Sequence, residues 1–133
     1  MTAATDGGQA LQLTRAVYGA ALLLRPGLTS RLATGHLPSR RACRVAWLLG
    51  ARHLAQATLS ALAPRPAVFA AGAAADALHA ASMLMLAVVD RAARRTALPD
   101  AMAEAAFAAA GLAAAAAYGG GTAAQPRPRA RGR

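Results

Sequence analysis

The sequence predicts an all-α fold, a transmembrane four-helix bundle with up-down antiparallel topology. Three observations predict it. Apolar residues make up 56% of the 133 residues, and only 15% are charged. The apolar residues gather into four runs that are separated by Pro, Gly and Arg. Fifteen basic residues against five acidic ones give a formal charge of +10, and most of the basic residues flank the runs. This distribution is typical of a multi-span membrane protein.

The four helices are expected at about residues 10–25, 40–63, 66–90 and 99–118. Residues 26–39 contain two prolines and two glycines and are expected to form a loop. The fourth helix is expected to begin at Pro99 and Asp100, because an acid there complements the positive helix end. Residues 1–9 are predicted to be a disordered N-terminus. Residues 119–133 are predicted to be a disordered Gly/Pro/Arg tail.

The composition and the absence of known motifs argue against several classes of protein. The single cysteine, Cys43, excludes an internal disulfide framework and a cysteine-based zinc site. The chain is too apolar to be disordered as a whole. It has no Gly-rich phosphate loop, no H-E-x-x-H, no nucleophile elbow and no C-x-x-C. No catalytic residue and no metal site are therefore predicted, and nothing points positively to an enzyme.

The arginines predict an orientation in the membrane. The segments at residues 25–44 and 90–98 hold eight arginines and lie on the same side of a four-span bundle. The positive-inside rule places both in the cytoplasm and both termini outside a bacterial plasma membrane. The tail conflicts with this orientation, because its four arginines would also lie outside. Either a short external tail is tolerated, or an end helix does not span and a three-span form places the tail inside.

A few polar residues lie within the second and third runs. Ionisable groups in hydrocarbon are costly and mark paired or functional sites. In an antiparallel hairpin that turns near residue 64, Arg52 and Asp76 lie at one depth, about 12 residues or 18 Å from the turn. We therefore expect these two side chains to pair. The predicted buried polar cluster consists of Arg52, His53, Gln56, Asp76 and His79.

The cluster has one structural and two functional interpretations. The structural interpretation is that it holds the second and third helices together and sets their register. The first functional interpretation is a path for protons or a small ligand. The second is that His53 and His79, on facing helices, bind haem axially or hold another redox cofactor; the structural interpretation requires no cofactor. Arg15 reaches a similar depth and is an additional candidate member. Glu104 is a further candidate, although its place near a helix start favours an interfacial charge.

The expected partner is the lipid bilayer, with a homo-oligomer or another membrane protein as a further possibility. A soluble, basic, helical nucleic-acid binder is the alternative class. Such a protein would spread its arginines along a helix face or an aromatic-studded sheet. Because the arginines here cluster between apolar runs, no nucleic-acid partner is expected.

The residues around the polar cluster carry a resemblance. Gly50–Ala57, together with Asp76–Met83 after the Pro66 break, resembles the small, uncharacterised four-helix integral membrane proteins of GC-rich actinobacteria. The resemblance covers roughly residues 10–118. It implies an integral membrane location, and it implies no activity and no site residue.

Overall fold

The computed structural model describes residues 3–123, and within them the chain is entirely helical apart from short connections, with no strand. Four helices are long and one is short. The all-α prediction is confirmed. In chain order the described helices are α1 (Ala3–Leu24), α2 (Pro26–Thr34), α3 (Arg40–Leu62), α4 (Pro66–Val89) and α5 (Arg94–Ala123).

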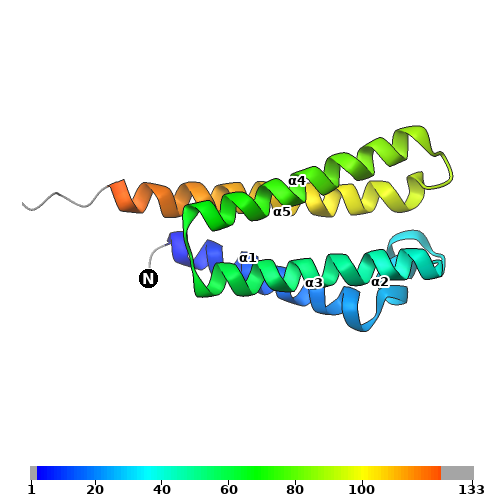
Figure 1. Ribbon diagram of the computed structural model, residues 1–133, viewed down its shortest axis with the longest axis horizontal. Coiled ribbons are helices and arrows are strands. Elements are labelled where there is room, and N and C mark those ends of the chain that lie inside the picture. The colour runs from blue at the N-terminus through cyan, green and yellow to red at the C-terminus, as the bar shows by residue number, and fades with distance from the viewer. Residues whose placement is uncertain (1–2, 124–133) are drawn as a thin grey trace, which may run out of the picture.

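The long helices form two antiparallel pairs (Figure 1). Helix α1 packs along α3, and α4 packs along α5. The chain passes from the first pair to the second through the turn at residues 63–65, between α3 and α4. Although α3 and α4 are consecutive, they approach each other much less closely than the members of each pair do. The two pairs meet mainly where α1 packs against α5, and the polar side chains described below also connect them.

The N-terminal half departs from the predicted boundaries at two places. Helix α1 begins at Ala3, within the segment 1–9 that was expected to be disordered. The expected loop at 26–39 contains α2. Pro26 opens α2 at a position where the missing N–H needs no partner. Gly35 ends it with a φ of 75°, and its N–H donates to the Arg31 carbonyl oxygen. Proline and glycine thus bound a short helix here.

Helix α5 is longer at both ends than predicted. The Asp90 carboxylate accepts the N–H groups of Ala92 and Ala93, and this turn starts the helix at Arg94 instead of Pro99. Pro99 lies inside the helix and costs it one backbone hydrogen bond. At the other end α5 continues through the glycines after Tyr118 to Ala123. The rest of the predicted tail, residues 124–133, lies outside the described residues.

Helices α1 and α3 meet backbone to backbone at Gly19 and Gly50. A Cβ atom at Gly19 would lie 2.8 Å from the Gly50 carbonyl oxygen, and a Cβ at Gly50 would lie 2.7 Å from that of Gly19. Glycines at a helix crossing allow the two backbones to approach closely. This contact fixes the register of α1 against α3.

Replacing Gly50 with alanine is therefore expected to destabilise the protein by about 1–3 kcal/mol, because the methyl group forces two backbones apart. Thermal unfolding of the purified protein, followed by helical circular dichroism, measures the loss. Gly7→Ala is the matched control, because a Cβ at Gly7 would have nothing within 4 Å and alanine favours a helix. Equal stability of Gly50→Ala and the wild type would contradict the close crossing.

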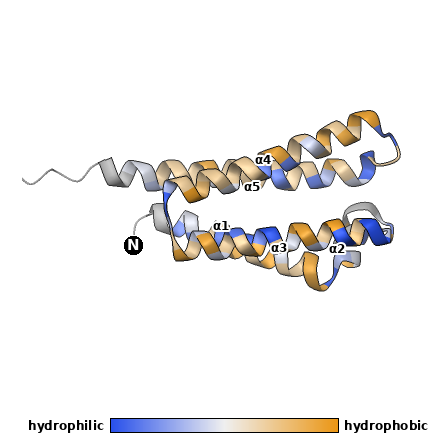
Figure 2. Cartoon of the chain, in the orientation of Figure 1, coloured by the Kyte–Doolittle hydropathy of each residue, from blue (hydrophilic) through white to orange (hydrophobic). Residues whose placement is uncertain are grey.

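The middle of the bundle has an inside-out distribution, in which charged side chains are buried and large apolar side chains are exposed. The largest fully buried side chains are Arg15, His53, Asp76 and Glu104. Each long helix also exposes large apolar side chains: Val17, Leu48, Leu78 and Met102 are between 71% and 74% exposed. Figure 2 shows apolar residues along α4 and α5, and hydrophilic ones concentrated where α2 and the start of α3 lie. A small apolar core cluster of Leu11, Phe69, Phe107 and Ala114 completes the interior.

Candidate functional site: a buried charge cluster

Each of the four long helices contributes one charged side chain to the middle of the bundle. Arginines come from α1 and α3, and carboxylates come from α4 and α5. His53 of α3 joins them through Glu104. We call this set the charge cluster: Arg15, Arg52, His53, Asp76 and Glu104. Its two arginines and two carboxylates balance when His53 is neutral.

Asp76 of α4 is the carboxylate that joins three helices. Arg15 donates from Nη2 to its Oδ2 at 2.5 Å. The Nη2 atom of Arg52 lies 3.2 Å from its Oδ1, and Gln56 donates to the same oxygen at 3.2 Å. Asp76 is 0% exposed, so both oxygens depend on these donors. The Arg52–Asp76 pair expected from the sequence is present, and Arg15 is the nearer partner.

Glu104 of α5 is buried and joins α3 to α5. Its side chain is 0% exposed. Arg52 donates to Oε2, and the Nε2 atom of His53 lies 2.7 Å from Oε1. The interpretation of Glu104 as an interfacial charge is therefore wrong. Because α5 begins at Arg94 and not at Pro99, Glu104 lies almost three turns inside the helix instead of in its first turn.

The guanidinium of Arg15 lies against two glycines and a phenylalanine. A Cβ at Gly72 of α4 would lie 3.0 Å from Arg15 Nη1, and one at Gly111 of α5 would lie 3.4 Å from Nη2. Arg15 also donates to the Phe107 carbonyl oxygen at 3.3 Å, and its Cζ lies 5.6 Å from the centre of the Phe107 ring. A side chain at Gly72 would press on the arginine that holds Asp76, whereas one at Gly111 would first meet the Cβ atom of Ala73, at 3.0 Å.

Aromatic rings enclose the His53 side of the cluster. The ring of Tyr18 meets that of His53 edge to face, with centroids 5.1 Å apart. Phe107 lies 4.7 Å from His53 and 5.4 Å from Tyr18. Such edge and tilted arrangements add to the apolar burial of the rings. His53 is thus held between a carboxylate and two rings.

His79 lies outside the charge cluster. Its Nε2 atom is 2.9 Å from Oδ2 of Asp100, and both side chains are partly exposed, at 18% and 25%. His53 and His79 thus direct their Nε2 atoms to two different carboxylates of α5. These are the two side chains that the sequence offers as axial haem ligands. Within residues 3–123, no group of three His, Cys, Asp or Glu side chains is arranged to hold a metal ion.

Several buried polar atoms near the cluster have no protein partner within the described part of the chain. Gln12, one turn before Arg15 on α1, is 8% exposed, and neither atom of its amide is hydrogen-bonded. The other such atoms are Arg15 Nε, Arg52 Nε, His53 Nδ1 and Gln56 Oε1. The interior therefore retains unused hydrogen-bonding capacity.

The structure brings together four of the five predicted cluster residues and both additional candidates. It places His79 in a separate pair. Sequence reasoning missed the residues in or beside the cluster at Gln12, Tyr18, Gly72, Phe107 and Gly111. It also missed Asp100, the partner of His79. Helical spacing offered a signal for some of them. Gln12 and Tyr18 lie three residues on either side of Arg15, and Asp100 lies four before Glu104, so each shares a face with a charged residue.

Two of the described helices are long and apolar enough to cross a membrane, judged by length and composition: α4 and residues Arg94–Gly120 of α5. No protein-family model matches the chain, and no curated protein or solved structure is significantly similar to it. The physical evidence for function is therefore the chain's own distribution of charge and apolar surface.

Proposed function

We propose that this chain is a small, multi-pass integral membrane protein of a bacterial plasma membrane, resembling the small actinobacterial four-helix membrane proteins. In this proposal α1, α3, α4 and α5 form a transmembrane, up-down antiparallel bundle. The charge cluster holds the two helix pairs together, and the protein has a structural or interaction role. The observation that carries the proposal is the inside-out distribution, in which the largest fully buried side chains are ionisable.

The energetics of solvation support a lipid environment. A monomeric soluble protein seldom exposes a large continuous apolar surface, whereas every long helix here exposes large aliphatic side chains. Lipid chains solvate such a surface without cost. The same lipid makes an unpaired charge very unfavourable, so α1 and α3 can cross only if Arg15 and Arg52 are paired inside the bundle. The two carboxylates of α4 and α5 supply that pairing.

The single cysteine offers a test of this location. Cys43 is partly buried in the first turns of α3, at the arginine-rich end that the positive-inside rule places in the cytoplasm. A membrane-impermeant maleimide is expected to label Cys43 only after cells are permeabilised. In the control Cys43→Ser/Arg65→Cys, the new thiol lies in the turn at the opposite end and is expected to react in intact cells.

Three outcomes are informative. Retention in the membrane after carbonate washing, with the expected labelling pattern, supports the proposal. The reverse labelling pattern, with retention, would overturn the orientation and leave the membrane location standing. Release by carbonate would overturn the membrane location and favour the soluble, basic, helical class.

A further inference from the structure

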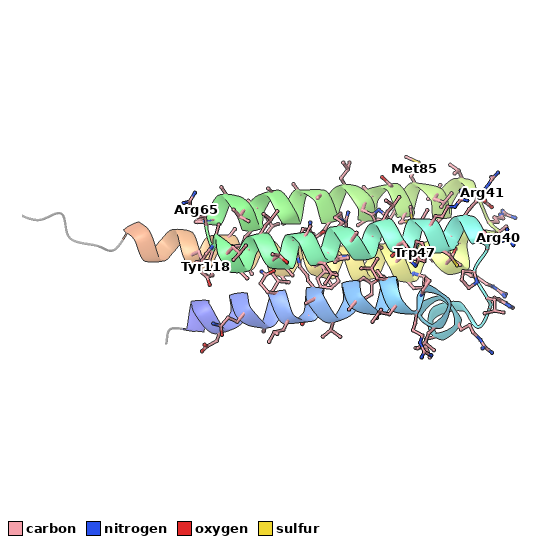
Figure 3. The ribbon with its side chains drawn as sticks, turned by 60° about the horizontal axis from the view of Figure 1, so that its bottom comes forward. Arg40, Arg41, Trp47, Arg65, Met85 and Tyr118 are labelled. Carbon is pink, nitrogen blue, oxygen red and sulfur yellow. The ribbon has the colours of Figure 1, made fainter. Side chains whose placement is uncertain are left out.

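Eight arginines gather at one end of the bundle. Helix α2, the start of α3 and the turn from α4 to α5 all lie at this end (Figure 1). Figure 3 shows Arg40 and Arg41 there, and Arg65 with Tyr118 at the opposite end. We call this set the arginine end: Arg25, Arg31, Arg40, Arg41, Arg44, Arg91, Arg94 and Arg95, all of them exposed.

The arginine end has almost no negative charge to offset it. Within residues 3–123, no ion pair joins any of these arginines to an acid. Asp90 is the acid in the turn, and its carboxylate already accepts two backbone N–H groups. Asp100 is paired with His79. A concentrated, uncompensated positive field therefore surrounds this end of the molecule.

The helix directions strengthen that field. Helices α2, α3 and α5 all begin at this end, and none has an acidic residue in its first turn. A helix start carries a partial positive charge and disfavours cations, yet Arg40, Arg41, Arg94 and Arg95 occupy first turns. An external anion would relieve this repulsion.

Apolar side chains beside the arginines indicate which anion fits. Trp47 lies one turn further along α3 than Arg44 and is 55% exposed, and an indole is favoured at the headgroup level. Val45 and Leu48 next to it are also exposed. Guanidinium groups bind phosphate through two parallel hydrogen bonds. A phospholipid satisfies both features, because its phosphate meets the arginines while its acyl chains cover the apolar side chains.

We propose that the arginine end binds the headgroups of anionic phospholipids and selects them over zwitterionic ones. This inference rests on the proposed membrane location. It goes beyond that location, because the positive-inside rule requires basic residues on one side of the membrane and does not require that they prefer one lipid over another. The same arginines that orient the chain would then gather a shell of anionic lipid around α3 and the α4–α5 turn.

The chain's only tryptophan reports on this site directly. The purified protein is reconstituted into vesicles that contain equal amounts of phosphatidylglycerol and phosphatidylcholine, with bromine on the acyl chains of one or the other. Brominated phosphatidylglycerol is expected to quench Trp47 fluorescence more strongly than brominated phosphatidylcholine. The triple variant Arg40→Gln/Arg41→Gln/Arg44→Gln is expected to lower this preference at least about fivefold, since each arginine near an anionic surface contributes about that factor.

Arg65→Gln is the matched control, because Arg65 lies at the opposite end, and it is expected to keep the preference. Equal quenching by the two lipids in the wild type would overturn the proposal, as would a triple variant with an unchanged preference. Displacement of phosphatidylglycerol by millimolar inorganic phosphate or by a short RNA would also overturn it, in favour of a soluble anion or nucleic acid. Carbonate release tests the membrane location separately, so failure of the two proposals can be distinguished.

Discussion

Replacing Asp76 with alanine is expected to lower the free energy of unfolding by about 3–5 kcal/mol, because it leaves Arg15 buried without its carboxylate. Arg52 loses its second acceptor at the same time, although Glu104 still holds it. Reversible unfolding by dodecyl sulfate in mixed micelles measures the loss. Asp6→Ala is the matched control, since Asp6 is an exposed acid on α1, and its change is expected to stay within about 0.5 kcal/mol.

A double-mutant cycle separates the ion pair from other effects of the substitution. The variant Arg15→Met/Asp76→Leu removes one positive and one negative charge and keeps the interior neutral. It is expected to recover most of the stability that either single change loses, since apolar residues of similar volume often replace a buried pair without cost. Strictly additive losses would show that Arg15 and Asp76 are not directly coupled.

The second large effect is expected at Glu104. Glu104→Ala leaves Arg52 with its longer contact to Asp76 and a hydrogen bond to the Ala75 carbonyl oxygen. It also leaves His53 without its hydrogen-bond partner, so a loss of about 3–5 kcal/mol is expected. An interfacial carboxylate would lose about 0.5 kcal/mol or less. The same unfolding measurement therefore decides between a buried and an interfacial Glu104.

Two further variants sharpen the test of Glu104. Glu104→Gln keeps the shape and one oxygen acceptor but removes the charge, so its loss is expected to lie between those of the wild type and Glu104→Ala. Asp100→Asn is the control on the same helix face, because the pair of Asp100 with His79 is partly exposed and such pairs contribute about 0–1 kcal/mol. A larger loss for Asp100→Asn than for Glu104→Ala would place the critical charge outside the cluster.

The pairing of Arg52 with Asp76 could be predicted because it depends on little more than chain geometry. A tight break near residue 64 joins two long apolar runs, and a helix rises by a constant amount per residue, so distance from the turn gives depth. Helices α3 and α4 make few contacts, but the predicted pair still forms, because the Arg52 side chain is long enough to reach Asp76 from the other helix pair.

The helix ends were less predictable, because local signals compete there. In the sequence, Pro26 and Gly35 favour a loop. In the structure, α2 begins at Pro26 and is capped by Gly35. Pro99 favours a helix start, and the Asp90 turn starts α5 five residues earlier. That difference moved Glu104 from a predicted interface to the interior.

By itself, the sequence determined that the chain is helical, that its apolar runs are bounded by arginine, and that charges lie at matching depth in two of the runs. Tertiary structure decided which charges meet. Alanine makes up nearly half of α5, so no apolar stripe marks the face that this helix turns inward. Depth along a helix does not specify that face either. Gly19 and Gly50 let α1 and α3 approach closely, and Gly72 leaves room for the Arg15 guanidinium. The way the helices pack therefore decides which partners Arg15 and Glu104 meet.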